Sequence, residues 1–371
     1  MNGYCFSGSY KPEDVIFLLK TIDMRPVDIT EKERRIQSGQ SHYSEIISKE
    51  QLPSDIYLTV FKEAFERNER RMAMDIIKLA HIIANQIEGD VTIVSLVRAG
   101  TPIGIILNRT LNSFFRKTTV HYSISIIRDR GIDENALLHL LRNESRSQES
   151  IVFVDGWTGK GVISRELKKS VRKFNLKHNT NLSDKLYVLS DLCGHADVAS
   201  SCEDYMIPSS VLNSTISGLV SRSILNDKYI GVNDFHGCLF YKDFEDYDLS
   251  NWFVDRMTAR IHEIDESYGV AHIEATPISG DIRKILRDKS VAFIRDAIKN
   301  HNVKNINFVK PGIGEATRVL LRRVPDKLIL RSKHHPDLQH LLILAREKIV
   351  PVVIDESLPY NAAAFIQNLT L

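Results

Sequence analysis

The chain has 371 residues, and its 49 lysines and arginines almost balance its 47 aspartates and glutamates, which gives a formal net charge of +2. With 43% hydrophobic and 26% charged residues, the composition is that of a globular protein, and the length favours two or three domains. No apolar run approaches the roughly 18 residues of a membrane helix. We expect neither a signal peptide nor a membrane anchor. Four widely spaced cysteines without a CxxC pair favour reduced thiols and a cytoplasmic location.

The first predicted element after an irregular lead-in over residues 1–50 is a long helix over 57–86. Its apolar residues recur at helical spacing and so form one face, which we interpret as core. The residues of that face are Phe61, Phe65, Met72, Ile76, Leu79 and Ile83.

From residue 91 to about 192, predicted strands alternate with predicted helices. The strands lie near 91–97, 119–126, 151–155 and 186–191, and they are almost wholly apolar. This alternation predicts a parallel sheet covered by helices on both faces. In such sheets ligands bind beyond the carboxyl ends of the strands, so we expect the functional loops there.

The first of these loops follows the strand in 91–104, which reads VTIVSLVRAGTPIG. Arg98, Ala99 and Gly100 come directly after the strand, and Thr101 with Pro102 provides the start signals of a helix over 103–115. Small residues let backbone amides approach an anion closely. The pattern resembles the pyrophosphate loop of type I phosphoribosyltransferases, and the resemblance implies that Ala99, Gly100 and Thr101 bind the diphosphate.

A second loop lies in 151–164, which reads IVFVDGWTGKGVIS. An apolar strand runs into Asp155, then into a glycine-rich turn, and then into a helical pattern. This order predicts helix N-terminal amides and an ammonium group around a phosphate. The spacing matches neither a Walker A loop nor a GxGxxG loop. The candidate phosphate-binding residues are Gly156, Thr158, Gly159, Lys160 and Gly161.

The less regular region 193–270 contains most of the cysteines. Cys193, His195 and Cys202 are followed by His236 and Cys238. Three interpretations stay open. The side chains are packed structural residues, or they bind a metal despite lacking zinc spacings, or Cys238 is a nucleophile with His236 or His195 as its base.

Beyond a composition change over 271–282, the chain shows a compact alternating pattern. Helices are predicted at 281–300, 314–323, 336–347 and 361–367, with strands at 305–310, 327–331 and 350–355. Residues 301–350 hold ten lysines and arginines against four aspartates and glutamates, which favours a polyanion such as RNA or tRNA. The candidate RNA-binding residues are Lys310, Arg318, Arg322, Arg323 and Lys327.

The two loops resemble the pyrophosphate and PRPP loops of type I phosphoribosyltransferases, and KPGIGEATRVLLRRVP over 310–325 resembles a pelota (L7Ae)-type RNA-binding domain. Together with FSGSY (6–10), HYSE (42–45) and FHGCLFY (235–241), they resemble one bacterial family of tellurium-resistance and stress gene clusters, some of whose relatives carry the name cysteine protease StiP. The resemblance implies an α/β fold. A phosphoribosyltransferase-like parallel sheet domain with an N-terminal helical extension spans 1–270, and a small α/β/α pelota-like domain spans 280–371.

The resemblance also implies an activity, namely a PRPP-dependent phosphoribosyltransferase that uses Mg²⁺ and makes or modifies a nucleoside-like metabolite. Its ligands would be PRPP or ribose 5-phosphate and an unidentified acceptor base or metabolite, with Mg²⁺ carried by PRPP and not by a protein-only site. Two alternatives stay open: a non-catalytic phosphoribose- or nucleotide-binding regulator, and a Cys238-dependent hydrolase. The expected catalytic residues are Asp155 at the ribose, Arg98, Arg128 and Arg130 at pyrophosphate, and Asp191 at the acceptor.

Overall fold

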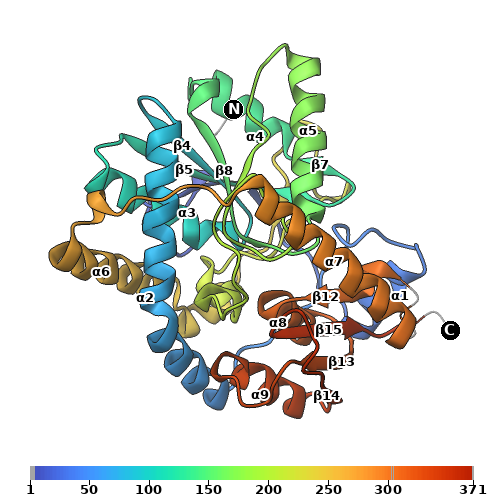
Figure 1. The fold of residues 1–371 in the computed structure, drawn as a ribbon. Coiled ribbons are helices and arrows are strands. Elements are labelled where there is room, and N and C mark those ends of the chain that lie inside the picture. Colours follow the sequence, from blue (N-terminus) through green and yellow to red (C-terminus); the bar gives the residue numbers. More distant parts are fainter. Residues whose placement is uncertain (1–4, 302, 304, 370–371) are drawn as a thin grey trace.

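The computed structural model describes residues 5–301, 303 and 305–369. It is a mixed α/β protein with two larger sheets and, within the described residues, two further two-stranded pairs (Figure 1). The larger sheet has seven strands in the order β1-β2-β5-β4-β8-β9-β10, and every neighbouring pair is parallel except β1–β2. Its strands are β1 (Cys5–Phe6), β2 (Ile16–Leu18), β4 (Val91–Leu96), β5 (Thr119–Ile124), β8 (Ile151–Thr158), β9 (Leu186–Asp191) and β10 (Val198–Ser201).

Alternation along the central strands gives this sheet two apolar faces, as its sequence predicts. Ile93 and Val152 join the core on one face, whereas Val94 and Phe153 join the core on the other. The first face is covered by α2 (Asp55–Gln86), α3 (Gly100–Phe114) and α6 (Ser250–Tyr268), and the second by α4 (Glu134–Arg142) and α5 (Val162–His178).

The smaller sheet has the order β12-β15-β13-β14 and lies beside the lower part of α2 in Figure 1. Its strand β13 pairs with β14 in parallel and with β15 antiparallel. Its elements are β12 (Val309–Pro311), β13 (Pro325–Leu330), β14 (Val352–Ile354), β15 (Ala362–Ile366), α7 (Gly280–His301), α8 (Ile313–Arg322) and α9 (Gln339–Glu347).

The predicted helix over 361–367 is wrong, because this segment is β15, the second strand of the smaller sheet. Three consecutive alanines favour a helix locally. All five residues of β15 are nevertheless buried, since β12 and β13 flank the strand on both sides. A wholly apolar run of five residues is typical of a buried strand, and here packing outweighs helix propensity.

The lead-in over 1–50 and the region 193–270 are more regular than predicted. The lead-in contains β3 (Lys20–Thr21) and α1 (Ile29–Gln37) besides the strands β1 and β2, and the later region contains α6. Asp28 caps α1, accepting hydrogen bonds from the backbone of Thr30 and Glu31. Asp28 is therefore a helix-start signal that the sequence contains and that the predicted irregular lead-in missed.

Both sheets share one continuous apolar core, which includes Phe61 and Ile76 of α2 together with Leu320 of α8 and Leu341 of α9. Asp204, after β10, strengthens this junction. Its carboxylate accepts hydrogen bonds from the backbone nitrogens of Ile313 at 2.9 Å and Asn361 at 2.7 Å. Within the described residues no helix is long and apolar enough to cross a membrane.

The central position of β15 predicts a large stability difference between two apolar truncations. Phe365 on β15 is fully buried, whereas Val353 on the edge strand β14 is 39% exposed. Phe365→Ala should destabilise the protein by about 3–5 kcal/mol, the range for large-to-small core substitutions. Val353→Ala, the matched control, should cost less than about 1 kcal/mol. Urea denaturation followed by circular dichroism measures both. Equal shifts of the midpoint would contradict the central placement of β15.

Candidate functional site: a cationic cleft between the two sheets

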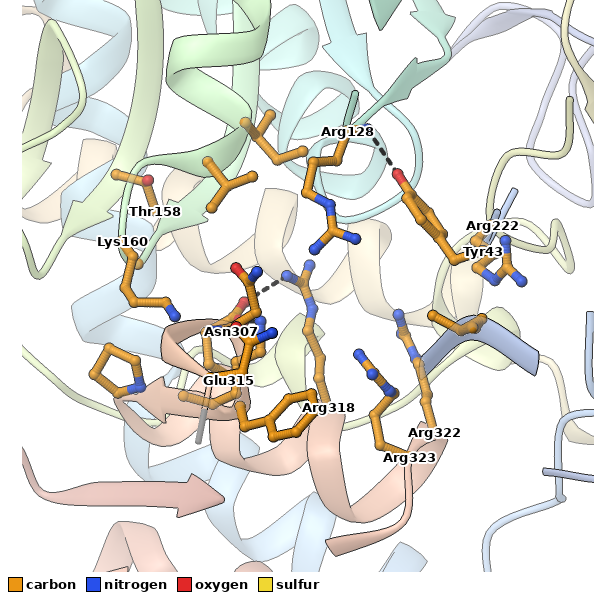
Figure 2. A pocket seen from close by; sticks show the side chains of 18 of the residues that line it. Tyr43, Arg128, Thr158, Lys160, Arg222, Asn307, Glu315, Arg318, Arg322 and Arg323 are labelled. Atoms are coloured by element: carbon orange, nitrogen blue, oxygen red, sulfur yellow. Dashed lines mark hydrogen bonds and ion pairs between the residues drawn. The ribbon is translucent and has the colours of Figure 1, made fainter. Parts of the chain in front are cut away.

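A cleft of about 620 Å³ lies between the carboxyl end of β8 and the smaller sheet (Figure 2). One wall comes from the β8–α5 turn, and the opposite wall comes from β12 and α8. Residues of α1 and the side chains of Tyr43, Arg128 and Arg222 close the remaining side. This volume lies in the usual range of small-molecule sites.

The β8–α5 turn keeps the backbone shape that its glycines predict. Gly161 has a φ of 71°, and a Cβ there would lie 2.3 Å from the ring of His195, so only glycine fits. Gly156, which lies within β8 and not in the turn that the sequence predicts, is also restricted, because a Cβ would lie 3.2 Å from the carbonyl oxygen of Ala99. The turn is therefore packed tightly against its neighbours on both sides.

Asp155 contributes a carboxyl group that changes charge near neutral pH. Burial raises its pKa to about 6, and the positive charge of Arg318 offsets this only in part. Its Oδ1 accepts a hydrogen bond from the backbone nitrogen of Gly156 at 2.8 Å.

Lys160 reaches across the cleft and donates a hydrogen bond to the carbonyl oxygen of Ile306 on the opposite wall. Burial, and then the nearby positive charge of Lys310, lower its pKa to about 7. An ammonium group in this state is poorly compensated by the protein, so a negative ligand would raise its pKa and be bound more tightly.

The opposite wall presents Lys310, Glu315 and Arg318. The Glu315 carboxylate lies 2.7 Å from the Arg318 guanidinium and 4.0 Å from Lys310 Nζ. Burial alone would raise the pKa of Glu315, but these two positive charges outweigh it and lower the pKa to about 2. The Arg318 guanidinium also covers the ring of Trp157 on β8, 4.3 Å from its centroid. Arg318 is thus fixed in place beside Glu315, as Figure 2 shows.

Helix α1 is tied to the wall that α8 forms through charged contacts. Arg323 makes two hydrogen bonds, of 2.6 and 2.8 Å, to the buried carboxylate of Glu33. Lys32 donates hydrogen bonds to Ser48 and to the carbonyl oxygen of Arg322, and burial lowers its pKa to about 8. These contacts hold the lead-in segment against the smaller sheet.

Tyr43 lies between two arginines at the remaining side of the cleft (Figure 2). The guanidinium groups of Arg128 and Arg222 lie 5.3 and 5.5 Å from its ring centroid. Its hydroxyl accepts a hydrogen bond from the backbone nitrogen of Arg128 at 2.7 Å, and burial lowers the pKa of Arg222 to about 10.

Positive charge predominates in the cleft. Eight lysines and arginines line it, against three carboxylates, so with every group ionised the lining carries a surplus of five positive charges. The cations are Lys32, Arg128, Lys160, Arg222, Lys310, Arg318, Arg322 and Arg323, and the carboxylates are Glu33, Asp155 and Glu315.

The residues predicted from the first loop do not line this cleft. Arg98 is buried and bonded by Glu50 at 2.6 Å, by the carbonyl oxygen of Val220 at 2.8 Å and by Asn213 at 3.2 Å. Thr101 bonds Ser123. Ala99 and Gly100 pack against β8, since a Cβ on Gly100 would lie 2.5 Å from the carbonyl oxygen of Val154.

Two other predicted catalytic residues make structural contacts outside the cleft. Asp191 accepts hydrogen bonds from the backbone nitrogens of Cys193, His195 and Ala196, and so caps the loop after β9. Arg130 is exposed and pairs with Glu45 at 2.8 Å. Neither residue lines the cleft.

Four of the five candidate RNA-binding residues, Lys310, Arg318, Arg322 and Arg323, face the cleft instead of an open surface. Arg322 Nε donates to Asn213 at 2.5 Å. Lys327 pairs with Asp326 and is not part of the lining.

Sequence reasoning missed the contributions of α1, Tyr43 and Arg222 to the cleft. Tyr43 belongs to the HYSE motif at 42–45, which supported the family resemblance although no function was predicted for its residues. For Lys32 and Arg222 no local signal exists, because only the packing of the two sheets brings these distant segments together.

The described thiols differ strongly in exposure. Cys193 and Cys238 are fully buried, and Cys202 is partly exposed. Burial raises the pKa of Cys193 to about 11 and that of Cys238 well above its ordinary value. His236 bonds Ser125 at 2.7 Å through Nδ1, and burial alone shifts the pKa of the Cys238 thiol. The structure therefore does not assemble Cys238 with a histidine base. Among the described residues no group of three or more histidine, cysteine, aspartate or glutamate side chains is arranged to hold a metal ion.

Comparison with known proteins shows the family to which this chain belongs. The family described as "Tellurite-like stress resistance cysteine protease StiP" matches residues 8–258, and the "PELOTA RNA binding domain" family matches residues 288–368. The chain therefore belongs to the StiP family, and the predicted family is confirmed. A similar relative is the "Cysteine protease StiP" of Acinetobacter baylyi (strain ATCC 33305 / BD413 / ADP1), which is 38% identical over 378 residues covering 98% of this chain and 95% of the relative.

Similarity to solved structures is weak. A solved structure described as "Analysis of an invariant aspartic acid in HPRTs-alanine mutant" is 14% identical to this chain. The match covers 48% of this chain and 94% of that chain, with a TM-score of 0.28. A probable N-succinyldiaminopimelate aminotransferase from Thermus thermophilus is 12% identical, with coverage of 73% and 79% and a TM-score of 0.21. Neither likeness supports an argument about activity.

The prediction of a PRPP-dependent phosphoribosyltransferase is wrong. The family and the relative that match this chain are named as cysteine proteases, which favours the hydrolase alternative. The expected transferase chemistry, with PRPP as substrate and Mg²⁺ as its metal, is wrong for the same reason. The physical reason for the error is that loop spacing predicts the shape of the backbone and not the partners of a side chain. The Arg98 guanidinium is bonded to Glu50, Val220 and Asn213 and does not face a ligand site.

The thiol environments predict a clear order of alkylation. With iodoacetamide near pH 8, Cys202 should react at least about ten times faster than Cys193 or Cys238, because only the exposed thiolate is an effective nucleophile. Peptide mapping by mass spectrometry measures the order, and the urea-unfolded protein, in which all thiols are accessible, is the control. Labelling of Cys238 as fast as Cys202 would contradict its burial.

Proposed function

We propose that the cleft binds a small, phosphate-rich anion. The observation that carries this proposal is the surplus of five positive charges in one cleft of about 620 Å³. Burial lowers the pKa of several of these cations, Lys160 and Lys310 among them, because charge is costly to hold away from water without compensation. A multiply charged anion supplies that compensation, and phosphate oxygens accept the hydrogen bonds that arginine and lysine donate.

We further infer that the larger domain is phosphoribosyltransferase-like in fold without that reaction, and that the smaller domain is pelota-like. Support for the first part comes from the parallel sheet and from two loops that touch at adjacent carboxyl ends of β4 and β8, where Gly100 and Gly156 allow close backbone approach. Support for the second comes from the family match to 288–368.

Calorimetry with pyrophosphate and with nucleoside diphosphates tests the binding proposal. Lys160→Ala and Arg128→Ala should each weaken binding about tenfold or more, since a charge-assisted hydrogen bond contributes about 1.5–3 kcal/mol. Both changes leave the Glu33 and Glu315 ion pairs intact. Arg116→Ala, an exposed arginine outside the cleft lining, is the control and should bind like the unchanged protein. Absence of binding by the unchanged protein at millimolar anion would overturn the proposal.

The cleft should bind anions more tightly in mild acid. As pH rises from about 5.5 to 8, Lys160 with its pKa of about 7 loses a positive charge, and Asp155 with its pKa of about 6 gains a negative one. Both changes reduce attraction for an anion, so affinity should fall. Lys160→Arg keeps its charge over this range and should flatten the profile. Calorimetry at several pH values, with a ligand whose own ionisation is corrected for, measures the effect; affinity that rises with pH contradicts it.

As a second function we propose a cysteine-dependent peptidase activity, which the names of the family and of the relative support. Cys238 is the candidate nucleophile because the imidazole of His236 lies two residues away in the chain, and the backbone nitrogen of His236 donates a hydrogen bond to the Asp133 carboxylate. In the present conformation this thiol is closed off. Activity therefore requires the segment 235–241 to leave its pairing with β3, where Cys238 lies opposite Thr21.

A protease assay tests the second function. The full chain should cleave an unstructured protein such as casein, with inhibition by thiol alkylation. Cys238→Ser should abolish cleavage, and Cys202→Ser, which changes the partly exposed thiol, should retain it. Cleavage that survives Cys238→Ser would remove Cys238 from the mechanism.

A further inference from the structure

A row of positive charge lies on the outer face of α5, outside the cleft. Arg165, Lys168, Lys169, Arg172 and Lys173 line one open hollow on this helix, and all but Lys168 are exposed. We call these five residues the α5 ridge. The spacing of three, four, seven and eight residues from Arg165 places their side chains on one face.

Helix stability does not account for the ridge. A helix N-terminus favours acidic residues, yet the first turn of α5 has none, and Arg165, Lys168 and Lys169 all lie in its N-terminal half. Lys168 pairs with Asp197 at 2.6 Å, and Arg172 pairs with Asp184 at 2.8 Å.

Two members of the ridge have no compensation from the protein. The side chains of Lys169 and Lys173 make no ion pair or hydrogen bond in the part of the chain that the structure describes. They are four residues apart on the same face, where two like charges repel. A partner that carries negative charge at regular intervals would relieve that repulsion.

The ridge begins at the wall of the cleft. Helix α5 starts directly after Gly161, and Arg165 Nη1 donates a hydrogen bond of 2.9 Å to the carbonyl oxygen of Lys160. From Arg165 to Lys173 the helix rises about 12 Å, at roughly 1.5 Å per residue. Nucleic acid strands space their phosphates about 3.4 Å apart along a duplex axis, so the ridge spans three or four of them.

The cleft itself is closed to a strand that would pass through it. On one side Lys160 bonds Ile306 across the gap, and on another side Lys32 and Glu33 bond the end of α8 at Arg322 and Arg323. These crossing contacts favour a strand end over a strand that passes through the cleft. An end that carries a phosphate also has the extra negative charge that the cationic lining favours.

We propose that the cleft ligand is the phosphorylated end of an RNA strand and that the following nucleotides lie along the α5 ridge. This inference rests on the anion-binding function proposed above. The opposite wall of the cleft belongs to the segment that matches the pelota RNA-binding family, which favours RNA over other polyanions. RNA contacts then extend beyond the smaller domain onto the larger one.

An anionic membrane is a poorer fit to the same charges. A helix that lies on a membrane inserts an apolar face, but Leu167, Val171 and Phe174 of α5 are buried against the sheet. Leu176, 88% exposed, is the one large apolar side chain that α5 presents to solvent.

Fluorescence anisotropy of the full chain tests the proposal with RNA of about ten nucleotides that carries a 5′-phosphate, a 3′-phosphate or neither. The ridge variant is the double substitution Lys169→Glu and Lys173→Glu. Its matched control is Lys62→Glu with Arg116→Glu, two exposed cations remote from both the ridge and the cleft lining. Calorimetry with a nucleoside monophosphate reports the cleft alone.

The proposal expects one of the phosphorylated RNAs to bind at least tenfold more tightly than the unphosphorylated one. The ridge variant should lose at least tenfold in RNA affinity, and the slope of log affinity against log salt should fall by about 1.4, at 0.7 per lost phosphate contact. Its affinity for the mononucleotide should stay unchanged, and the control variant should behave like the unchanged protein.

Three results would overturn it. If the ridge variant binds RNA like the control while the mononucleotide still binds, the ridge proposal fails and the cleft proposal stands. If neither RNA nor mononucleotide binds, the cleft proposal fails as well. If the unchanged protein binds phosphatidylserine vesicles through the ridge and binds RNA no better than the ridge variant, the ridge is a membrane surface.

Discussion

Uncompensated positive charge between the two sheets is the constraint on which the rest of the structure depends. Glu33 pairs with Arg323 and Glu315 pairs with Arg318, so two of the three carboxylates in the cleft are already used. The remaining cations are held close together without an equal number of anions. Charge is costly to hold away from water, so burial lowers the pKa of Lys160, Lys310 and Arg222.

The protein tolerates this cost because other contacts fix the two walls. One apolar core runs from α2 into α8 and α9, and the Asp204 carboxylate ties β10 to two backbone nitrogens of the smaller sheet. A preformed cleft of uncompensated charge needs little additional free energy for ordering when an anion enters. Little of the interaction energy is then lost to ordering the cleft. An anion that binds only the folded cleft would also stabilise the packing of the two sheets against each other.

The thiols and the cleft point to different chemistries in one chain. Cys238 lies on β11 (Gly237–Cys238) in the apolar core, whereas the cleft is lined mainly by cations. The family is named for a cysteine protease, whereas burial raises the pKa of the Cys238 thiol and keeps it from solvent. The family match covers the strands of the larger sheet after β1, and the cationic cleft lies at the junction with the smaller sheet.

The sequence alone was sufficient for four of the parallel strands, the long helix α2 and the tight turn at Gly161, because periodicity and glycine chemistry act over a few neighbouring residues. It was also sufficient for the family. It did not predict β2 and β10, which also pair in parallel. It misjudged β15, where burial between two strands outweighs the helix propensity of alanine. It assigned Arg98 to a ligand, although Glu50 and Asn213, far away in sequence, already occupy that guanidinium.

The composition of the cleft was decided only by the tertiary structure. Lys32, Tyr43, Arg222 and the residues of α8 lie far apart along the chain, and they meet because the two sheets share a core. Charge counting along the chain located the basic segment 301–350 but could not say which way its arginines face. That direction depends on packing between distant segments, which no local pattern encodes.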